Sequence, residues 1–291
     1  MKRFLLEKSD KEFYTSHSGL ALVGACINRF TDFRKRINDV SPRSGGISHA
    51  DIARGYLRLL CMGKSDYEAI TDRREDRYFQ TSLGLSVVPS AETLRQRFDA
   101  EADRFRIVTN YCAVDFVKRA QGLVTPLENG YVPLDIDVVP FDNSDTKKEG
   151  VSRTYHGTDG YAPIAAYLGL EQFHSEFRRY RPVGKTDLDI ERFPSGKFAT
   201  NALVLSMAAF AYNILRFIGQ LGLLGDRTPV RHAAKRRRIK TVIQELIYLA
   251  ARMIEKGRRL RLQFSRHCPA FAAFVKVYER VMGPAAVPAT G

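Results

Sequence analysis

YVPLDIDVVPFDNSDTKKEGVSRTYHGTDGYAPIAAYLGLE, at residues 131–171, is the stretch that decides the fold predicted by this sequence. Residues 131–139 alternate with a period of two, which predicts a β-strand. Leu134, Ile136 and Val138 then point to one face of the strand, and Asp135 and Asp137 point to the other. Residues 161–168 form a second apolar run, which we expect to pair with the first strand.

The two aspartates are the main candidates for chemistry. Asp135 and Asp137 would stand side by side on a rigid strand, and carboxylate oxygens are hard ligands that suit Mg²⁺ or Mn²⁺. On spacing alone, a solvated face of an edge strand explains the pair as well and is the commoner arrangement. Glu171 is expected to open a helix directly after the second apolar run. The Glu171-x-x-His174 spacing also occurs in di-iron helix bundles, but such a site needs two of these motifs and the sequence offers one.

The charge of the chain favours a polyanionic partner. Its 291 residues include 46 Lys and Arg against 32 acids, a net charge of +14. Residues 226–280 hold 15 of the basic residues and four acids, so +11 of the surplus is concentrated there. Such a field favours contacts with the phosphates of DNA or RNA. The basic run AKRRRIK, at residues 234–240, could also be a solvated helix start. Within it, the candidate DNA-binding residues are Lys235, Arg236, Arg237, Arg238 and Lys240.

Helical periodicity dominates residues 48–121. Ser48 is a plausible N-cap for a helix that Gly63 ends, and a short second helix follows at residues 65–70. Ser90 can cap a third helix, from which Arg95 and Arg97 project, and residues 102–121 continue as an amphipathic helix. Short helices joined by tight turns fit a DNA-binding helix-turn-helix, and an ordinary bundle with a solvated arginine face fits them equally well.

Two later segments are expected to be helical. Within residues 197–224, the most apolar part of the chain, the uncharged segment at residues 199–215 is barely long enough to span a bilayer. Asn201 and Asn213 lie inside this segment and Arg216 follows, so we favour a core helix over a membrane span. Residues 239–254 form the second predicted helix, with Ile243 and Ile254 among its inward-facing residues.

The cysteines and the N-terminus indicate a cytoplasmic protein. The four cysteines lie far apart without a CxxC pair, which suits a reducing compartment and argues against a disulfide framework and a zinc site. The start of the chain, MKRFLLEKSDKEF, has no apolar core of a signal peptide.

Several long motifs, in order, resemble one protein family. They are LDID at 134–137, YHGTDGYAPIAAYLG at 155–169, EQFHSEF at 171–177, KTDLDIERFPSGKFATNALVL at 185–205 and AYNILRFIGQ at 211–220. The later runs KRRRIKTVIQELIYLAARMI and HCPAFAAFVKVYERV are similar to the C-terminal region of the same family. Together they resemble a bacterial insertion-sequence transposase of the DDE-domain, group 1 type, over nearly the whole chain.

The resemblance implies a fold like ribonuclease H and an Asp-Asp-Glu triad. In such enzymes the triad binds two divalent ions, Mg²⁺ or Mn²⁺, for DNA cleavage and strand transfer. The first aspartate carries over to Asp137, or to Asp135, and the glutamate carries over to Glu171, so Asp137 and Glu171 would be metal ligands. The implied partners are double-stranded DNA, with its terminal inverted repeats, and further copies of the chain, with no membrane. The implied location is the cytoplasm, at the nucleoid.

The second aspartate of the triad has no counterpart. In the family it lies on a later strand, within a long segment that precedes the glutamate helix. Here only Leu170 separates Gly169 from Glu171, and Asp142, Asp145 and Asp159 do not match the missing position. A second departure is the insertion RRYRPVG after Phe177. We therefore expect a family member with an internal deletion that is inactive as a nuclease, or a non-catalytic DNA-binding remnant that inhibits an intact relative.

The expected fold class is α+β, with a truncated ribonuclease H-like sheet flanked by helical regions. Residues 1–125 are expected to form a helical region with a possible helix-turn-helix, and residues 126–196 the remnant of the catalytic domain. Residues 197–283 are expected to form a basic helical region, and residues 284–291 a disordered tail.

Overall fold

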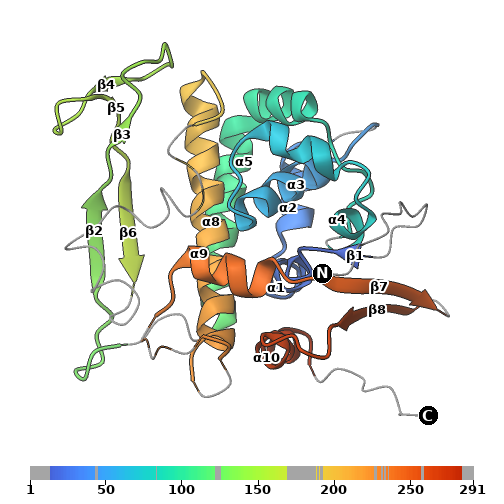
Figure 1. Cartoon of the computed structure of the whole chain (residues 1–291). Coiled ribbons are helices and arrows are strands. Elements are labelled where there is room, and N and C mark those ends of the chain that lie inside the picture. Colours follow the sequence, from blue (N-terminus) through green and yellow to red (C-terminus); the bar gives the residue numbers. More distant parts are fainter. Residues whose placement is uncertain are drawn as a thin grey trace, which may run out of the picture.

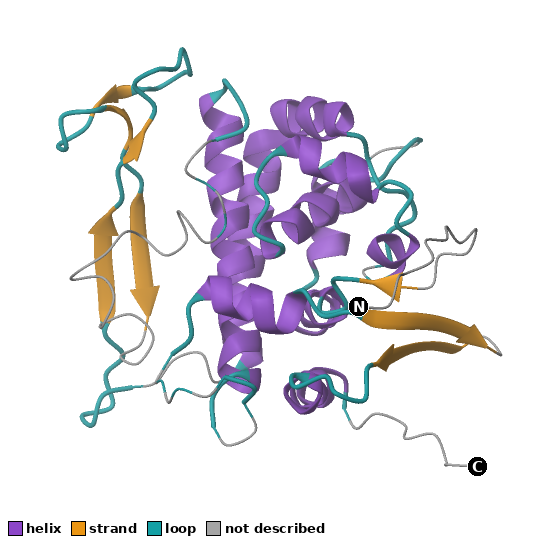
Figure 2. Cartoon of the chain, viewed as in Figure 1, coloured by secondary structure: helices purple, strands orange, loops and turns teal. Residues whose placement is uncertain are grey.

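A computed structural model describes residues 14–42, 45–82, 84–121, 126–168, 188, 190, 193–225, 228–230, 232, 234, 236–256 and 259–283. Within these residues the architecture is α+β, as expected. Figure 1 shows a central body of helices, with one group of strands beside α8 and a separate hairpin on the other side. Figure 2 shows that the strands of the two groups do not join.

Most of the helical body comes from the first 120 residues. Its elements are α1 (Leu20–Phe30), α2 (Phe33–Val40), α3 (His49–Cys61), the 3₁₀-helix η1 (Tyr67–Arg73), α4 (Arg77–Thr81) and α5 (Ala91–Ala120). Later in the chain, α8 (Phe198–Gly222) and α10 (Phe271–Met282) complete it.

The predicted helix signals at Ser48, Gly63 and Ser90 are confirmed. The Ser48 side chain accepts a hydrogen bond from the backbone N–H of Asp51 at 3.0 Å. Gly63 has a φ of 70°, the left-handed conformation that suits glycine after a helix end. The Ser90 side chain accepts from the N–H of Thr93 at 3.1 Å. The helix that begins there runs unbroken to Ala120, so the two helical patterns of this region form one long helix, α5.

Aromatic rings join α1, α5 and α8 into one core. Phe116 of α5 lies edge-on to Phe30 of α1, with ring centroids 5.6 Å apart, and to Phe217 of α8 at 5.7 Å. Phe30 and Phe217 are also in contact, at 5.4 Å. Edge-to-face aromatic pairs add to the free energy gained by burial. The N-terminal region and the apolar helix α8 therefore share a core.

The helix α8 occupies the position of a core helix in this structure. By length and composition alone it could cross a membrane, and 72% of its most apolar window is buried inside the protein. Arg216, only 3% exposed, donates to the hydroxyl of Tyr212 at 2.6 Å and to the carbonyl of Arg237 at 2.8 Å. The one charged side chain of this helix thus has hydrogen-bond partners for both of its terminal nitrogens within the protein.

The expected strand pair is confirmed over residues 134–138 and 164–168, whereas Tyr161 belongs to a different strand. Strand β2 (Leu134–Val138) pairs antiparallel with β6 (Ile164–Leu168), with Asp135 opposite Tyr167 and Asp137 opposite Ala165. Strands β3 (Phe141–Asp142), β5 (Asp159–Tyr161) and β4 (Ser152–Arg153) form a small sheet in the order β3-β5-β4. The ribonuclease H-like detail stays a prediction, because the described strands form three small antiparallel sheets.

The two faces of the β2–β6 pair are unequally covered. Leu134, Ile136 and Ile164, on the aliphatic face, are 55%, 65% and 71% exposed. The opposite face, which carries both aspartates, is turned toward α8, because the Tyr167 ring lies 6.3 Å from that of Tyr212 and packs against the core. The aliphatic side of this pair is therefore the exposed side.

The predicted helix over residues 239–254 is wrong beyond residue 247. A short helix α9 (Ile239–Val242) continues as a π-helical turn η2 (Ile243–Ile247), after which β7 (Ala251–Lys256) and β8 (Arg259–Phe264) form a hairpin. Strand β1 (Tyr14–Thr15) pairs with the other edge of β7. Neighbours on both edges of β7 override the helical spacing of its residues, since β preference depends on such context. Ile254, expected inside a helix, lies on a strand.

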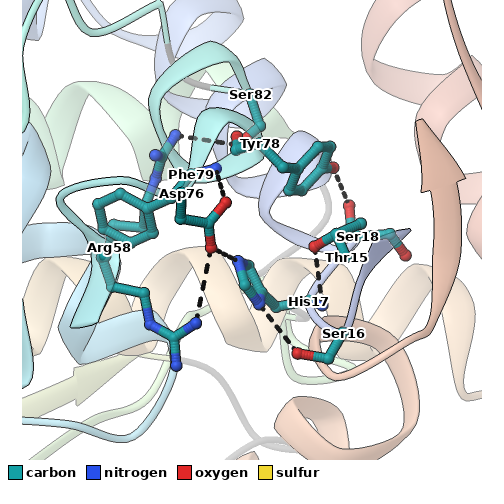
Figure 3. A network of polar contacts seen from close by, with 10 residues as sticks. Thr15, Ser16, His17, Ser18, Arg58, Asp76, Tyr78, Phe79 and Ser82 are labelled. Carbon is teal, nitrogen blue, oxygen red and sulfur yellow. Dashed lines mark hydrogen bonds and ion pairs between the residues drawn. The ribbon is translucent and has the colours of Figure 1, made fainter. Parts of the chain in front are cut away.

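A buried polar network ties β1 to α4 (Figure 3). The His17 Nε2 atom lies 2.9 Å from Asp76 Oδ2, and the N–H of Phe79 donates to Asp76 Oδ1 at 2.8 Å. Burial by itself would raise the pKa of Asp76. The hydrogen bonds from His17 and Phe79, with the charges of His17 and Arg73, outweigh burial and leave this pKa lowered. Asp76 is therefore held as a carboxylate.

Candidate functional site

The predicted carboxylates Asp135 and Asp137 lie on the α8-facing side of β2. They share that side because residues two apart on a strand point the same way. Asp137 is exposed, and its Oδ1 accepts from the N–H of Val138 at 2.9 Å. Burial raises the pKa of Tyr167, and the charges of Tyr212 and Asp137 raise it further. Asp137 is thus electrostatically coupled to the ring that packs the strand pair against α8.

A cavity of about 250 Å³ lies between the strand pair and α8. Its walls are mainly apolar, and its polar side chains are Tyr167, Tyr212 and Asn213. Neither aspartate of β2 lines it. The cavity is therefore a gap beneath the strand pair, separate from the carboxylates.

The described residues do not bring a third metal ligand to these aspartates. Among them, no three His, Cys, Asp or Glu side chains are grouped closely enough to hold a metal ion. Glu171 lies outside the described residues. Asp142 accepts from the hydroxyl of Ser144 at 2.7 Å, and Asp159 lies 3.5 Å from Arg153. Two carboxylates can serve a single Mg²⁺, which often keeps several waters. The described residues do not make a two-ion site, and we derive no chemical step through one.

Arg95 on α5 is bound by acids of the protein itself. Its guanidinium pairs with Glu92 and lies 3.2 Å from Glu68. These hydrogen bonds, the one to Glu92 first, raise the pKa of Arg95. Arg97 is partly buried on the same helix. Whether the two arginines contact DNA stays a prediction, and for Arg95 it would require exchange of its acidic partners for phosphates.

The basic run contains surface residues and one buried residue that stabilises the fold. Arg238 and Lys240 are exposed and Arg236 is partly buried, whereas Lys235 lies outside the described residues. Arg237 is only 9% exposed. Its guanidinium donates to the carbonyls of Leu223 at 3.0 Å, Val230 at 3.4 Å and His232. Arg237 therefore closes the loop that follows α8 and is not presented at the surface.

Sequence reasoning missed the basic hairpin β7–β8. Arg252, Arg259 and Arg261 are exposed on it. The segment RLRLQF at 259–264 alternates strictly between polar and apolar residues, which is the signal of a half-buried strand. That signal was present, but the helical spacing just before it concealed the first strand of the hairpin.

Comparison with known proteins identifies one family. Residues 182–283 match the family described as transposase DDE domain group 1. The matched range contains α8, the basic run, the hairpin β7–β8 and α10, and it excludes Asp135, Asp137 and Glu171. No curated protein and no solved structure matches the chain. The match of residues 182–283 to the transposase DDE domain group 1 family supports a DDE-type transposase.

Proposed function

We propose that this chain is an insertion-sequence transposase that retains DNA binding but has lost phosphodiester cleavage. The family match supports the transposase function. The loss of cleavage is supported mainly by the exposed aliphatic face of the β2–β6 pair. The chain would act in the cytoplasm on nucleoid DNA, as a homo-oligomer at terminal inverted repeats.

The exposed aliphatic face fits the loss of neighbouring structure. Large aliphatic side chains on one face of a sheet are normally covered, and here five of them have substantial exposure. They are Leu134, Ile136, Val138, Ile164 and Leu168. Strand β6 ends at Leu168, so only two residues precede Glu171. Two residues cannot hold a further strand, since strands usually span three to ten residues. The strand that would carry a second aspartate therefore has no place before Glu171.

The chemistry of the family also needs more than this chain supplies. Two divalent ions about 3.5–4 Å apart would activate the attacking oxygen and stabilise the leaving oxygen of a phosphodiester. Asp137 and Glu171 would supply ligands for one such ion at most. We therefore expect DNA cleavage at background level.

DNA binding is expected to persist because the basic C-terminal region does not depend on the carboxylates. Arg238 and Lys240 are exposed at the start of α9, and the chain carries a net charge of +14. A chain that binds the ends of the element without cutting them would compete with an intact relative and inhibit it.

A nicking assay with a parallel binding measurement tests the proposal. Supercoiled DNA that carries terminal repeats is incubated with the protein and Mg²⁺ or Mn²⁺, and duplex binding is followed by fluorescence anisotropy. We expect binding that weakens with salt, and no metal-dependent nicking. Nicking that disappears in Asp137→Ala but persists in the control Asp142→Ala would overturn the loss of cleavage. Absence of duplex binding at low salt would overturn the retention of DNA binding.

A further inference from the structure

The C-terminal hairpin β7–β8 has two chemically different faces. Residues directly opposite each other in an antiparallel pair point to the same side. The register therefore defines an outer face made of Arg252, Ile254, Arg259, Arg261 and Gln263. The inner face is made of Ala251, Met253, Glu255, Leu260, Leu262 and Phe264. Three of the five outer-face residues are Arg, whereas the inner face is mainly apolar and carries one acid, Glu255.

The inner face attaches the hairpin to the body of the protein. The Phe264 ring lies 5.4 Å from that of Phe271 and 4.8 Å from that of Phe274, both on α10. Met253 and Leu262 also pack against the core. Strand β1 pairs with the edge of β7 that β8 does not occupy. Figure 1 shows the hairpin extending away from the helices. The hairpin is thus anchored on one side and presented on the other.

On the outer face Arg252, Arg259, Arg261 and Gln263 are exposed, Ile254 is half-buried, and none of the five positions carries an acid. The one acid of the two strands, Glu255, lies on the inner face and pairs with Arg77 of α4. Within the part of the chain that the structure describes, no ion pair joins Arg259 or Arg261 to a carboxylate. Tyr14, 67% exposed, lies opposite Arg252 in the β1–β7 pair and extends the same face. The hairpin therefore presents a positive surface with an aromatic ring at one side.

We propose that this outer face is a DNA-binding surface that enters the major groove of a duplex. The major groove of B-DNA is about 12 Å wide and admits a two-stranded β-ribbon. Arginines on such a ribbon can contact phosphates at the groove edges, and Arg261 and Gln263 are of the types that recognise bases. Double-stranded RNA fits less well, because its major groove is too narrow for side chains to read. The inference rests on the proposed function, since it assigns a surface to the DNA that the transposase handles.

Two double variants of the full chain test this surface. Arg259→Ala/Arg261→Ala removes two outer-face charges. The control Arg104→Ala/Arg106→Ala removes two charges from α5, one exposed at Arg104 and one half-buried at Arg106, where each arginine forms an ion pair within its own helix. Binding of a labelled duplex is measured by anisotropy between about 50 and 200 mM salt. The outer-face variant should lower the slope of log K against log salt by about 1.8, that is 0.9 per lost phosphate contact, and the control should leave it unchanged.

Additional variants and a folding control separate the loss of a DNA contact from a loss of structure. Arg259→Lys/Arg261→Lys should restore the salt slope, because lysine keeps the charge. Thermal unfolding by circular dichroism verifies that the variants fold, and Arg261→Glu gives a second readout from one exposed side chain. The inference is overturned if the outer-face variant binds like the parent, if the control loses as much affinity, or if duplex RNA displaces the DNA more effectively than duplex DNA does. A parent that fails to bind any duplex at low salt would instead overturn the proposed function.

Discussion

Substitution of Arg237 tests most sharply whether a residue of the basic run stabilises the fold or contacts DNA. Its guanidinium is almost fully buried and donates to three carbonyls in the loop after α8, those of Leu223, Val230 and His232. Arg237→Ala would leave these carbonyls without their donor. Hydrogen bonds from a charged group contribute about 1.5–3 kcal/mol each. The bond to Val230 is long, and the site is not completely sealed from water. Two bonds at the lower end of this range give a loss of about 3 kcal/mol in the free energy of unfolding.

Urea unfolding followed by circular dichroism measures that loss, with the neighbouring Arg238→Ala as the matched control. Arg238 is exposed, so its replacement should change the free energy of unfolding by no more than about 0.5 kcal/mol. It should lower the salt slope of DNA binding by about 0.9 if Arg238 contacts a phosphate. If Arg237→Ala unfolds at the same urea concentration as the parent, Arg237 does not stabilise the fold. If that variant weakens DNA binding as a folded protein while Arg238→Ala has no effect, Arg237 is the DNA contact.

Three further outcomes follow from the core and the strands. Phe116→Ala should lower the free energy of unfolding by about 3–5 kcal/mol, because its ring is fully buried. Ile107→Ala, at an exposed site of the same helix, should lower it by about 0.5 kcal/mol or less. Equal losses in urea unfolding would contradict the packing. Because the pKa of Asp76 is lowered in the folded state, its contribution to stability is present above the unfolded pKa, near 3.9, and is lost as the pH falls through the folded value. The parent should therefore lose stability below about pH 4 more steeply than Asp76→Asn, and parallel curves would refute the coupling. Gly160→Ala would place a Cβ 1.8 Å from a carbonyl oxygen of β3 and should abolish amide-exchange protection in the β3-β5-β4 sheet; Gly196→Ala, which has open space around it, should not.

The parts of the fold that the sequence predicted are those with local signals. Ser48 and Ser90 mark helix starts through their own side chains, and the alternation from Leu134 to Val138 marks a strand whose partner is a second apolar run. Alternation separates two faces of a strand but does not say which is covered. The packing of Tyr167 against Tyr212 on a distant helix decides that, and no local pattern contains it.

The C-terminal hairpin is a case in which the local pattern predicted the wrong structure. Residues 239–254 have helical spacing, yet the chain leaves the helix at Ile247, because β7 gains neighbours in β8 and in β1, about 240 residues earlier. Such a pairing has a long sequence separation and leaves no trace in nearby residues. Among the candidate DNA contacts, burial of Arg237 depended likewise on carbonyls of a loop whose path the sequence did not predict.

The exposed aliphatic face of the β2–β6 pair also bears on how the protein behaves in concentrated solution. An exposed apolar sheet face can associate with the same face of another copy. The net charge of +14 opposes this, because like-charged molecules repel each other before such short-range contacts form. Salt shortens the range of that repulsion to about 10 Å at 0.1 M and about 3 Å at 1 M, while apolar attraction persists. Solubility of the DNA-free protein should therefore fall as the salt concentration rises, and substitution of Ile136 and Ile164 by Thr should reduce this dependence.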